Sequence, residues 1–535
     1  MVHDPRIFLH QIALPPGTTG IPLAVKDNID VAGMPTTAGC PSFAYQPAAD
    51  AAVVGKLRAA GYVPMGKTNL DQFATGLVGT RSPAGMPDNP AAPGFISGGS
   101  SSGSGVAVAA GIVPVALGTD TAGSGRIPAA FGNIVGIKPT KGWLSTQGVV
   151  PAVRSLDCVS VFALTVAEAW RATTLAAGFD GVDVFSRQRP GVTLPGGSLR
   201  IGVPTVLDDV DPAWRAGHLA AQEILRGLGH QIVTVDFSPF AAAASLLYGG
   251  AWVAERTAAV GDFLDREPAD ADPVVSRIIR GGRNHDALAA WRGTYELARL
   301  RRLADAQWER MDVLLLPTAC RHPTPADVAA DPVGVNSALG RFTNFANLLD
   351  TSAIALPVSY AGGVPVGITL FAPAWHDPLL ARLGAAFQDA TALPLGATGR
   401  RLTAPQDLVI PDDGLVVAVF GAHLQGEPLH QHLLSWGARL VGPCRTAPIY
   451  RCHRLPGAIE RPGLVRVETG GGEFSGELYR MSPEALGRLV ASVAPPLGLG
   501  TVILADRKPV IGFICEAIGV VGTPDITDRG SWRNR

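Results

Sequence analysis

Short apolar runs alternate with Ala-rich stretches along the first three quarters of the chain. Runs rich in Val, Ile and Leu at residues 21–25, 113–118 and 313–316 have the length of buried strands. Residues 52–60 and 212–228 form longer stretches rich in Ala and Leu, which are typical of helices. This alternation predicts an α/β fold in which helices cover a mixed central sheet.

The pattern changes after a segment that contains Pro and Asp, TGRRLTAPQDLVIPDD, at residues 398–413. Segments of this composition commonly join domains. Beyond it, strands are predicted at residues 415–420, 449–452, 464–467 and 501–505, with helices at 430–437 and 483–494. We therefore expect a catalytic domain at residues 1–397, a linker at residues 398–413 and a smaller α+β domain at residues 414–535.

Composition and charge argue against several classes of protein. The chain is 47% hydrophobic and 17% charged with a formal net charge of −1, so we expect a large core and no nucleic-acid partner. The apolar stretch at residues 106–117 is too short to cross a bilayer, and no membrane partner is expected. The six cysteines contain no CxxC pair, which argues against disulfides and a zinc site. With no signal-peptide pattern in the first residues, a reducing cytoplasm is the expected location.

Residues 61–68, GYVPMGKT, match the GxxxxGK[ST] pattern of a phosphate-binding loop. Such a loop leaves a strand and opens a helix, so that its backbone N–H groups converge on phosphate. Here a predicted helix comes first, Gly61 stands where a helix C-cap belongs, and Pro64 has no N–H to donate. We therefore reject a nucleotide-binding function.

The run GGSSSGSG also matches the GxSxG elbow of α/β-hydrolases, with Ser101 as the nucleophile. That mechanism needs an acid and a later histidine, for which His322 and His376 are candidates. No β-branched strand runs directly into the segment, so the elbow lacks its first half. A flexible Gly/Ser linker is the other alternative, but a helix-like apolar run follows at once, which is unusual for a linker.

Three segments taken together favour a different chemistry. Lys26 follows an apolar run in GIPLAVKDNID, Ser100 lies in GGSSSGSG, and Ser124 lies in ALGTDTAGSGRIPAA. With GKTNLDQFATG and GIKPTKG, this order resembles the amidase signature family over residues 21 to about 390. The resemblance implies an amidase-signature fold in which Ser124 is the nucleophile, Lys26 the base, and Ser100 a serine after a cis peptide bond that links them.

Amide hydrolysis needs a nucleophile, a route for the proton and donors for the oxyanion. A lysine acts as a base only when neutral, and burial next to an apolar run should lower the pKa of Lys26. The small residues Thr121, Ala122, Gly123 and Ser124 are the candidate oxyanion hole, because their N–H groups could point into one concavity. This chemistry needs no histidine, and we expect no cofactor and no metal.

The segment LLYGGAWVAER resembles the substrate-binding segment of the allophanate hydrolases within this family. Tyr248 and Arg256 fall on its two functional positions. A planar guanidinium suits the carboxylate of allophanate, and on one helix the two residues would lie about 80° apart. Taken without the resemblance, packing by Tyr248 and a surface ion pair of Arg256 would be the simpler interpretation.

The tail contains segments, VFGAHLQGEPLHQHL among them, that resemble the C-terminal domain of allophanate hydrolases. The resemblance implies a fold like gamma-glutamyl cyclotransferase and a role in handling N-carboxycarbamate, with His423 as the candidate residue. It also implies a homodimer and a link to a urea carboxylase or to ring degradation. Only 25 residues precede Lys26, fewer than is usual in the family. An aliphatic amidase, a transamidation subunit that supplies ammonia and an inactive scaffold remain as alternatives.

Overall fold

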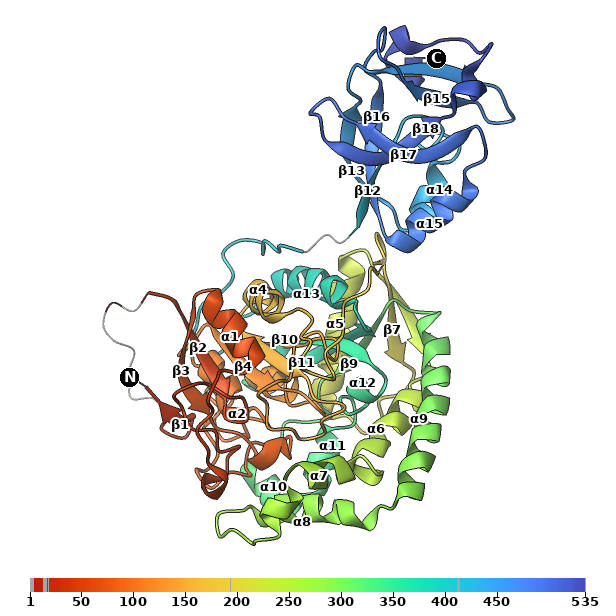
Figure 1. Ribbon diagram of the computed structural model, residues 1–535. Helices are drawn as coiled ribbons and strands as arrows, with labels where there is room; N and C mark the ends of the chain where they lie inside the picture. The colour runs from red at the N-terminus through yellow and green to blue at the C-terminus, as the bar shows by residue number, and fades with distance from the viewer. Residues whose placement is uncertain (1–3, 13–16, 18, 193, 411–413, 535) are drawn as a thin grey trace. The chain divides into compact units, whose positions relative to one another are not determined.

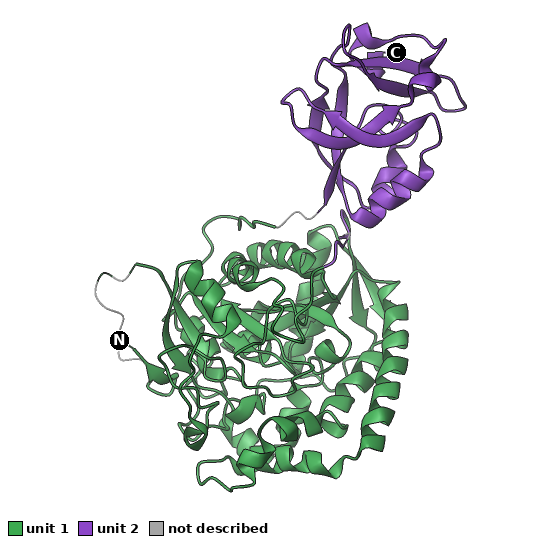
Figure 2. Cartoon of the chain, viewed as in Figure 1, with its two compact units in different colours: residues 1–189, 198–410 green, residues 190–197, 411–535 purple. Residues whose placement is uncertain are grey.

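The computed structural model describes residues 4–12, 17, 19–192, 194–410 and 414–534. The chain divides into two compact units, residues 1–189 with 198–410 and residues 190–197 with 411–535 (Figure 2). Part of the segment predicted as a linker packs on unit 1, since Trp170 Nε1 donates to Val409 O at 3.0 Å.

Unit 1 is built on one mixed sheet surrounded by helices (Figure 1), which confirms the predicted fold class. Among the described residues its strand order is β1-β3-β2-β4-β6-β5-β10-β11-β9-β7-β8. The strands are β1 (Phe8–Gln11), β2 (Ile21–Lys26), β3 (Tyr62–Thr68), β4 (Val115–Thr119), β5 (Val135–Lys138), β6 (Val159–Ala163), β7 (Arg200–Pro204), β8 (Gln231–Val235), β9 (Val313–Pro317), β10 (Thr351–Ala361) and β11 (Val364–Pro373). The three strands predicted in this unit are confirmed as β2, β4 and β9.

The predicted helices in this unit are confirmed as α1 and α5. The helices are α1 (Ala52–Ala59), α2 (Ser102–Ala109), α3 (Ile127–Phe131), α4 (Val166–Ala176), α5 (Pro212–Gly227), α6 (Ser238–Gly249), α7 (Val253–Leu264), α8 (Pro273–Gly281), α9 (Ala287–Trp308), α10 (Pro325–Ala330), α11 (Gly334–Leu339), α12 (Phe345–Leu348) and α13 (Asp377–Thr391). Every residue of β4, β5 and β6 is buried, as expected for strands covered on both faces.

The segment that resembles a phosphate-binding loop has the opposite order of elements. Gly61 has φ +88 and follows α1, and the motif itself forms β3. Lys67 is buried in that strand, where its Nζ lies 3.1 Å from Asp27 Oδ1. The lysine therefore takes part in an internal ion pair.

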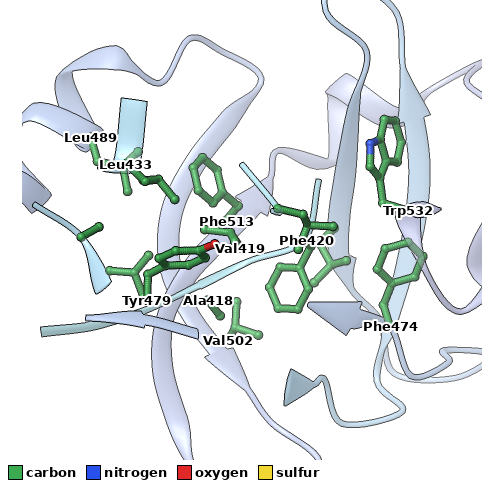
Figure 3. Packing of buried hydrophobic residues seen from close by; sticks show 14 of the residues in the cluster. Ala418, Val419, Phe420, Leu433, Phe474, Tyr479, Leu489, Val502, Phe513 and Trp532 are labelled. Carbon is green, nitrogen blue, oxygen red and sulfur yellow. The ribbon is translucent and has the colours of Figure 1, made fainter. Parts of the chain in front are cut away.

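Unit 2 contains the sheet β13-β16-β12-β18-β17 and the pair β14-β15. Its elements are β12 (Leu415–Val419), α14 (His430–Ser435), β13 (Arg439–Arg445), β14 (Tyr450–Leu455), β15 (Arg461–Arg466), β16 (Ser475–Met481), α15 (Pro483–Ser492), β17 (Leu497–Ile503) and β18 (Pro509–Cys515). All four predicted strands and both predicted helices are present. Figure 3 shows its core, in which Leu433 and Leu489 of the two helices lie near Phe513 of β18.

Candidate active site

Lys26 is the last residue of β2, and its side chain is fully buried. Strands β2 and β4 are parallel neighbours, so Thr119, the last residue of β4, ends at the same edge of the sheet. Lys26 Nζ lies 2.7 Å from Ser100 Oγ and 2.7 Å from Thr119 Oγ1 and donates to both. The structure thus brings together two of the predicted residues and adds Thr119, which sequence reasoning missed.

Burial lowers the pKa of Lys26 from 10.5 to about 7, in the direction that the sequence predicted. The charges of Asp71, Asp157 and Asp120 oppose this shift, whereas the guanidinium of Arg256 adds to it. Near neutral pH, a large fraction of the Lys26 amine is therefore neutral and able to accept a proton.

The peptide bond between Gly99 and Ser100 is cis, as the family resemblance predicted. The backbone of Ser100 is anchored to Asp71, whose N–H donates to Ser100 O at 3.0 Å. The carboxylate of Asp71 accepts from Gly79 N at 3.0 Å and Arg81 N at 2.9 Å. Burial raises the pKa of Asp71, and Arg81 opposes this shift. Asp71 therefore ties the loop that follows it to the Ser100 backbone.

The alternative nucleophile Ser101 lacks the strand-to-helix elbow. Helix α2 begins at Ser102, but residues 77–101 form no strand. Ser101 Oγ donates to Thr119 O at 3.2 Å, deep in the core. This geometry does not fit the elbow of an α/β-hydrolase.

Ser124 lies in the turn that joins β4 to α3, together with Thr121, Ala122 and Gly123. Its side chain is buried, and its Oγ donates to Gly76 O at 3.4 Å. The turn continues into α3 because Ile127 N and Arg126 N both donate to the carbonyl of residue 123. The N–H groups of residues 121–124 are therefore held in one short loop.

Gly123 has a steric reason to be glycine. It has φ +153, and a Cβ atom placed on it would lie 2.4 Å from Thr343 Oγ1. Any larger residue would displace the turn or Thr343, whose buried hydroxyl makes no hydrogen bond among the described residues. The backbone at the predicted oxyanion hole is thus fixed by close packing.

A buried ion pair between Asp120 and Arg126 stabilises the same turn. Arg126 Nε and Nη2 each lie 2.8 Å from the carboxylate of Asp120, which also accepts from Gly125 N at 3.0 Å. Asn347 Nδ2 donates to Asp120 O at 2.7 Å and to Thr121 O at 3.2 Å. These positioning residues were not identified from the sequence.

A third carboxylate, Asp157, binds Thr121 in the turn. It accepts from the hydroxyl of Thr121 and from Ala152 N at 2.8 Å and Val153 N at 3.2 Å. Burial raises the pKa of Asp157, an effect opposed first by the hydrogen bond from Thr121. Thr121 is therefore fixed through both its carbonyl and its side chain.

Tyr248 and Arg256 meet, but not on one helix. Tyr248 belongs to α6 and Arg256 to α7, because α6 ends before Gly250, whose backbone is extended; the single-helix geometry expected from the sequence is wrong. Arg256 Nη2 nevertheless lies 3.2 Å from Tyr248 Oη, and its Cζ lies 5.1 Å from the centre of the Tyr248 ring. The connection between the helices brings the pair together.

Arg256 reaches the same short segment as Ser124. Arg256 Nη1 donates to Thr75 Oγ1 at 2.8 Å, and the next residue, Gly76, is the one whose carbonyl accepts from Ser124. Arg256 is only 1% exposed, so a surface ion pair does not describe it. Its Nε has no hydrogen-bond partner among the described residues.

His423, the candidate in unit 2, lines a cavity of about 170 Å³. Its ring stacks on Phe513 with centroids 5.2 Å apart, and His432 and Arg461 also line the cavity. Burial lowers the pKa of His423 to about 4, and the charges of neighbouring His432 and Arg461 add to this effect. The imidazole is therefore neutral near pH 7.

The described part of the chain contains no cluster of three or more His, Cys, Asp or Glu side chains that could hold a metal ion. None of its helices is both long and apolar enough to cross a membrane.

Each of the two units matches a known protein family. The Amidase family model matches residues 13–381, and the model of the allophanate hydrolase C-terminal domain matches residues 415–535. The urea amidolyases of Lachancea kluyveri and Saccharomyces cerevisiae are 43% and 42% identical over 96% of this chain. The chain spans only 29% of the length of these two relatives.

Two further comparisons cover most of the related protein. The allophanate hydrolase of Kluyveromyces lactis is 42% identical with a TM-score of 0.86, over 96% of this chain and 87% of that one. One subunit of the glutamyl-tRNA(Gln) amidotransferase of Natronomonas pharaonis is 34% identical over 69% of this chain and 95% of its own length. The chain therefore belongs to the amidase family, whose members hydrolyse amides, and carries the C-terminal domain of the allophanate hydrolases.

Proposed function

We propose that the chain hydrolyses allophanate, a urea that carries a carboxylate, and releases ammonia and N-carboxycarbamate. The single observation that carries this proposal is the position of Arg256. Its buried guanidinium is bound to Thr75, next to the residue that accepts from Ser124, and it has an N–H without a partner among the described residues. The two relatives named urea amidolyase and the structure named allophanate hydrolase support the same substrate.

In the proposed mechanism, Ser124 Oγ attacks the carbonyl carbon of the terminal amide. The proton of Ser124 passes to Ser100, and Ser100 passes its own proton to neutral Lys26. When the tetrahedral intermediate collapses, the C–N bond breaks and the proton returns through Ser100 to the departing nitrogen, which leaves as ammonia. Water then attacks the acyl group on Ser124 and releases N-carboxycarbamate.

The N–H groups of the turn at residues 121–124 are proposed to bind the oxyanion. Removal of one donor of this kind typically raises a barrier by about 2.7–4 kcal/mol. The supports described for this turn, Asp120 with Arg126 and Asp157 with Thr121, hold the donors in place before the substrate arrives. Electrostatic stabilisation of this kind depends on such prior orientation.

Arg256 is proposed to bind the substrate carboxylate, with Tyr248 beside it. Among the described residues no carboxylate forms an ion pair with Arg256; the carboxylate of Asp157 acts on this buried cation only from beyond ion-pair distance. A guanidinium and a carboxylate can form two parallel hydrogen bonds. The substrate would then supply both a carboxylate at ion-pair distance and a partner for the unpaired N–H.

We further propose that unit 2 promotes the breakdown of N-carboxycarbamate to ammonia and carbon dioxide, with His423 in the cavity as its candidate residue. Allophanate would come from a urea carboxylase, as the urea amidolyase relatives indicate, or from ring degradation. A homodimer and a cytoplasmic location complete the proposal. Light scattering of the purified protein tests the first, and fractionation of cells tests the second.

The direct test is ammonia release by the purified protein from allophanate, glutamine and a small neutral amide such as acetamide. The proposal requires the largest kcat/KM with allophanate. A preference for acetamide would support an aliphatic amidase, and a preference for glutamine would support a transamidation subunit. No turnover of any of the three by folded protein would support an inactive scaffold.

A further inference from the structure

Two cavities adjoin residues of the active site, and their charges are opposite. We call the first the basic vestibule; it has a volume of about 400 Å³, and its lining includes Arg81, Tyr248, Arg277 and His285. The second, the acidic cavity, has a volume of about 350 Å³, and its lining includes Asp30, Asp157, Asp183 and Arg154. Both volumes fall in the range of small-molecule sites.

The basic vestibule adjoins the side of the site that holds Arg256. Tyr248, on its wall, accepts from Arg256 Nη2. A second wall residue, Arg81, donates through Nη1 to Thr75 O at 3.0 Å, and Thr75 also accepts from Arg256. A third, Asn336, accepts from Leu77 N at 2.7 Å. The wall is therefore bonded to the segment of residues 75–77 that contacts both Arg256 and Ser124.

Of the two arginines that line the vestibule, the buried Arg81 interacts electrostatically with the carboxylate of Asp71. None of the described residues that line the vestibule is acidic. Arg277 is exposed on α8 and forms no ion pair or hydrogen bond with any described residue. By contrast Arg280 and Arg283, its neighbours along the chain, both pair with Asp265. Arg277 thus offers a free positive charge at the cavity.

The acidic cavity offers the opposite environment. Asp30 and Asp183 accept hydrogen bonds from hydroxyl groups of Thr36, Tyr45 and Thr146, and neither forms an ion pair with another described residue. The positive charge that lines this cavity is Arg154, against three carboxylates. An anion approaching from this side would meet like charge.

From this contrast we infer that the basic vestibule is the entrance for the anionic substrate, and that Arg277 draws its carboxylate toward Tyr248 and Arg256. The inference rests on the proposed function in that allophanate is an anion. A fixed charge beside an entrance raises the local concentration of the opposite ion, and salt screens this effect over about 10 Å at 0.1 M ionic strength. Arg277 is therefore a specificity residue that acts before the substrate reaches Ser124.

The test compares Arg277→Gln with Arg302→Gln in the full chain. Arg302 is exposed and, like Arg277, has no ion pair among the described residues. It lies far along α9 from the vestibule: His285, which lines the vestibule, precedes the first residue of α9 by two positions, and Arg302 is fifteen residues, or roughly 22 Å, beyond that first residue. Each variant is assayed for kcat/KM with allophanate and with acetamide at 20 mM and 500 mM salt. We expect Arg277→Gln to lower the allophanate value about two- to five-fold relative to acetamide at low salt, with most of the loss absent at high salt.

A second experiment, which measures labelling of the nucleophile, does not depend on allophanate being the substrate. Fluorophosphonates with and without a carboxylate react with the nucleophile, and their two labelling rates give a ratio for each protein. Arg277→Gln should lower the ratio of anionic to neutral labelling at low salt, whereas Arg302→Gln should leave that ratio close to the wild-type value. Equal ratios for both variants, or a loss by Arg277→Gln that persists at 500 mM salt, would overturn the vestibule proposal. Failure of wild type to act on allophanate would overturn the proposed function alone.

Discussion

Each unit holds one candidate nitrogen base: Lys26 in unit 1 is fully buried, and His423 in unit 2 is partly buried. Lys26 in unit 1 donates to two hydroxyl groups, and three nearby carboxylates oppose the effect of its burial, so its pKa falls only to about 7. His423 in unit 2 stacks on a phenyl ring, and its charged neighbours are cations, so its pKa falls to about 4. Burial acts on both in the same direction. Because an amine starts at 10.5 and an imidazole at 6.5, burial brings the pKa of Lys26 into the neutral range and takes that of His423 below it, and the neighbouring charges modify each shift.

This contrast separates two chemical roles. The amine of Lys26 changes its protonation state near pH 7, as a general base that takes and returns a proton should. The imidazole of His423 stays neutral over the same range, so it can offer one N–H and one lone pair but no positive charge.

The largest effect is expected for removal of the base in unit 1. Lys26→Ala should abolish measurable ammonia release from allophanate, a loss of at least about 10²–10⁴-fold, because the proton of Ser124 then has no acceptor. Ser100→Ala should retain a small residual activity, since the lysine could act through water. Circular dichroism should show both variants folded. Near-normal turnover of Lys26→Ala at pH 7 would refute the proton route.

Arg256→Lys keeps the charge but removes the planar pair of donors. Loss of one charge-assisted hydrogen bond is worth about 1.5–3 kcal/mol, so kcat/KM for allophanate should fall roughly ten- to a hundred-fold. Acetamide has no carboxylate and should be affected much less. The measurement is the pair of kcat/KM values in wild type and variant. An equal fall for both substrates would mean that Arg256 supports the fold and does not recognise the substrate.

The third prediction concerns pH. Lys26 has a lowered pKa of about 7 and is protonated below it, so ammonia release should rise about tenfold per pH unit below pH 7 and level off above about pH 8. The histidine of unit 2 titrates near pH 4, so breakdown of N-carboxycarbamate that depends on it should change little from pH 6 to 9. The pH profile of initial ammonia release measures the first step, and the pH profile of the lag between ammonia release and carbon dioxide release measures the second. Profiles that share one midpoint near pH 7 would remove the contrast between the two units.

The smallest effect is expected from changes in unit 2 on the first reaction step. His423→Ala should leave the first ammonia within about twofold of wild type and slow the clearance of N-carboxycarbamate. A chain that ends near residue 413 should also fold and cleave the first amide. Loss of the first step in the truncated chain, with unit 1 still folded by circular dichroism, would show that unit 2 helps to build the active site.

Sequence patterns predicted the fold where local signals were strong. The strands around Lys26 and the helices of the tail follow from apolar runs of the right length. The pattern did not reveal that Tyr248 and Arg256 belong to two helices, because the sequence on both sides of Gly249 and Gly250 is rich in Ala and favours helix. In this case tertiary packing, and not helical spacing, sets the distance between the two side chains.

The residues that sequence reasoning missed act through long-range contacts. Thr119 meets Lys26 across 93 positions, and Asn347 meets Asp120 across 227. No local pattern encodes such pairs. One signal was available for Thr119, since Lys26 and Thr119 each directly follow a short predicted strand, and the ends of parallel neighbours meet at one edge of a sheet. Which strands are neighbours became known only from the sheet order.

Ser124 is proposed to be the nucleophile, and allophanate is proposed to bind beside it. Peptide mass spectrometry tests this after brief treatment of the protein with a neutral fluorophosphonate, alone and with allophanate or acetamide, each at the one concentration that saturates the site with allophanate. We expect one adduct, on Ser124, which forms more slowly with allophanate than with an equal concentration of acetamide. An adduct on Ser101 or elsewhere, or equal labelling with both amides, would contradict this proposal.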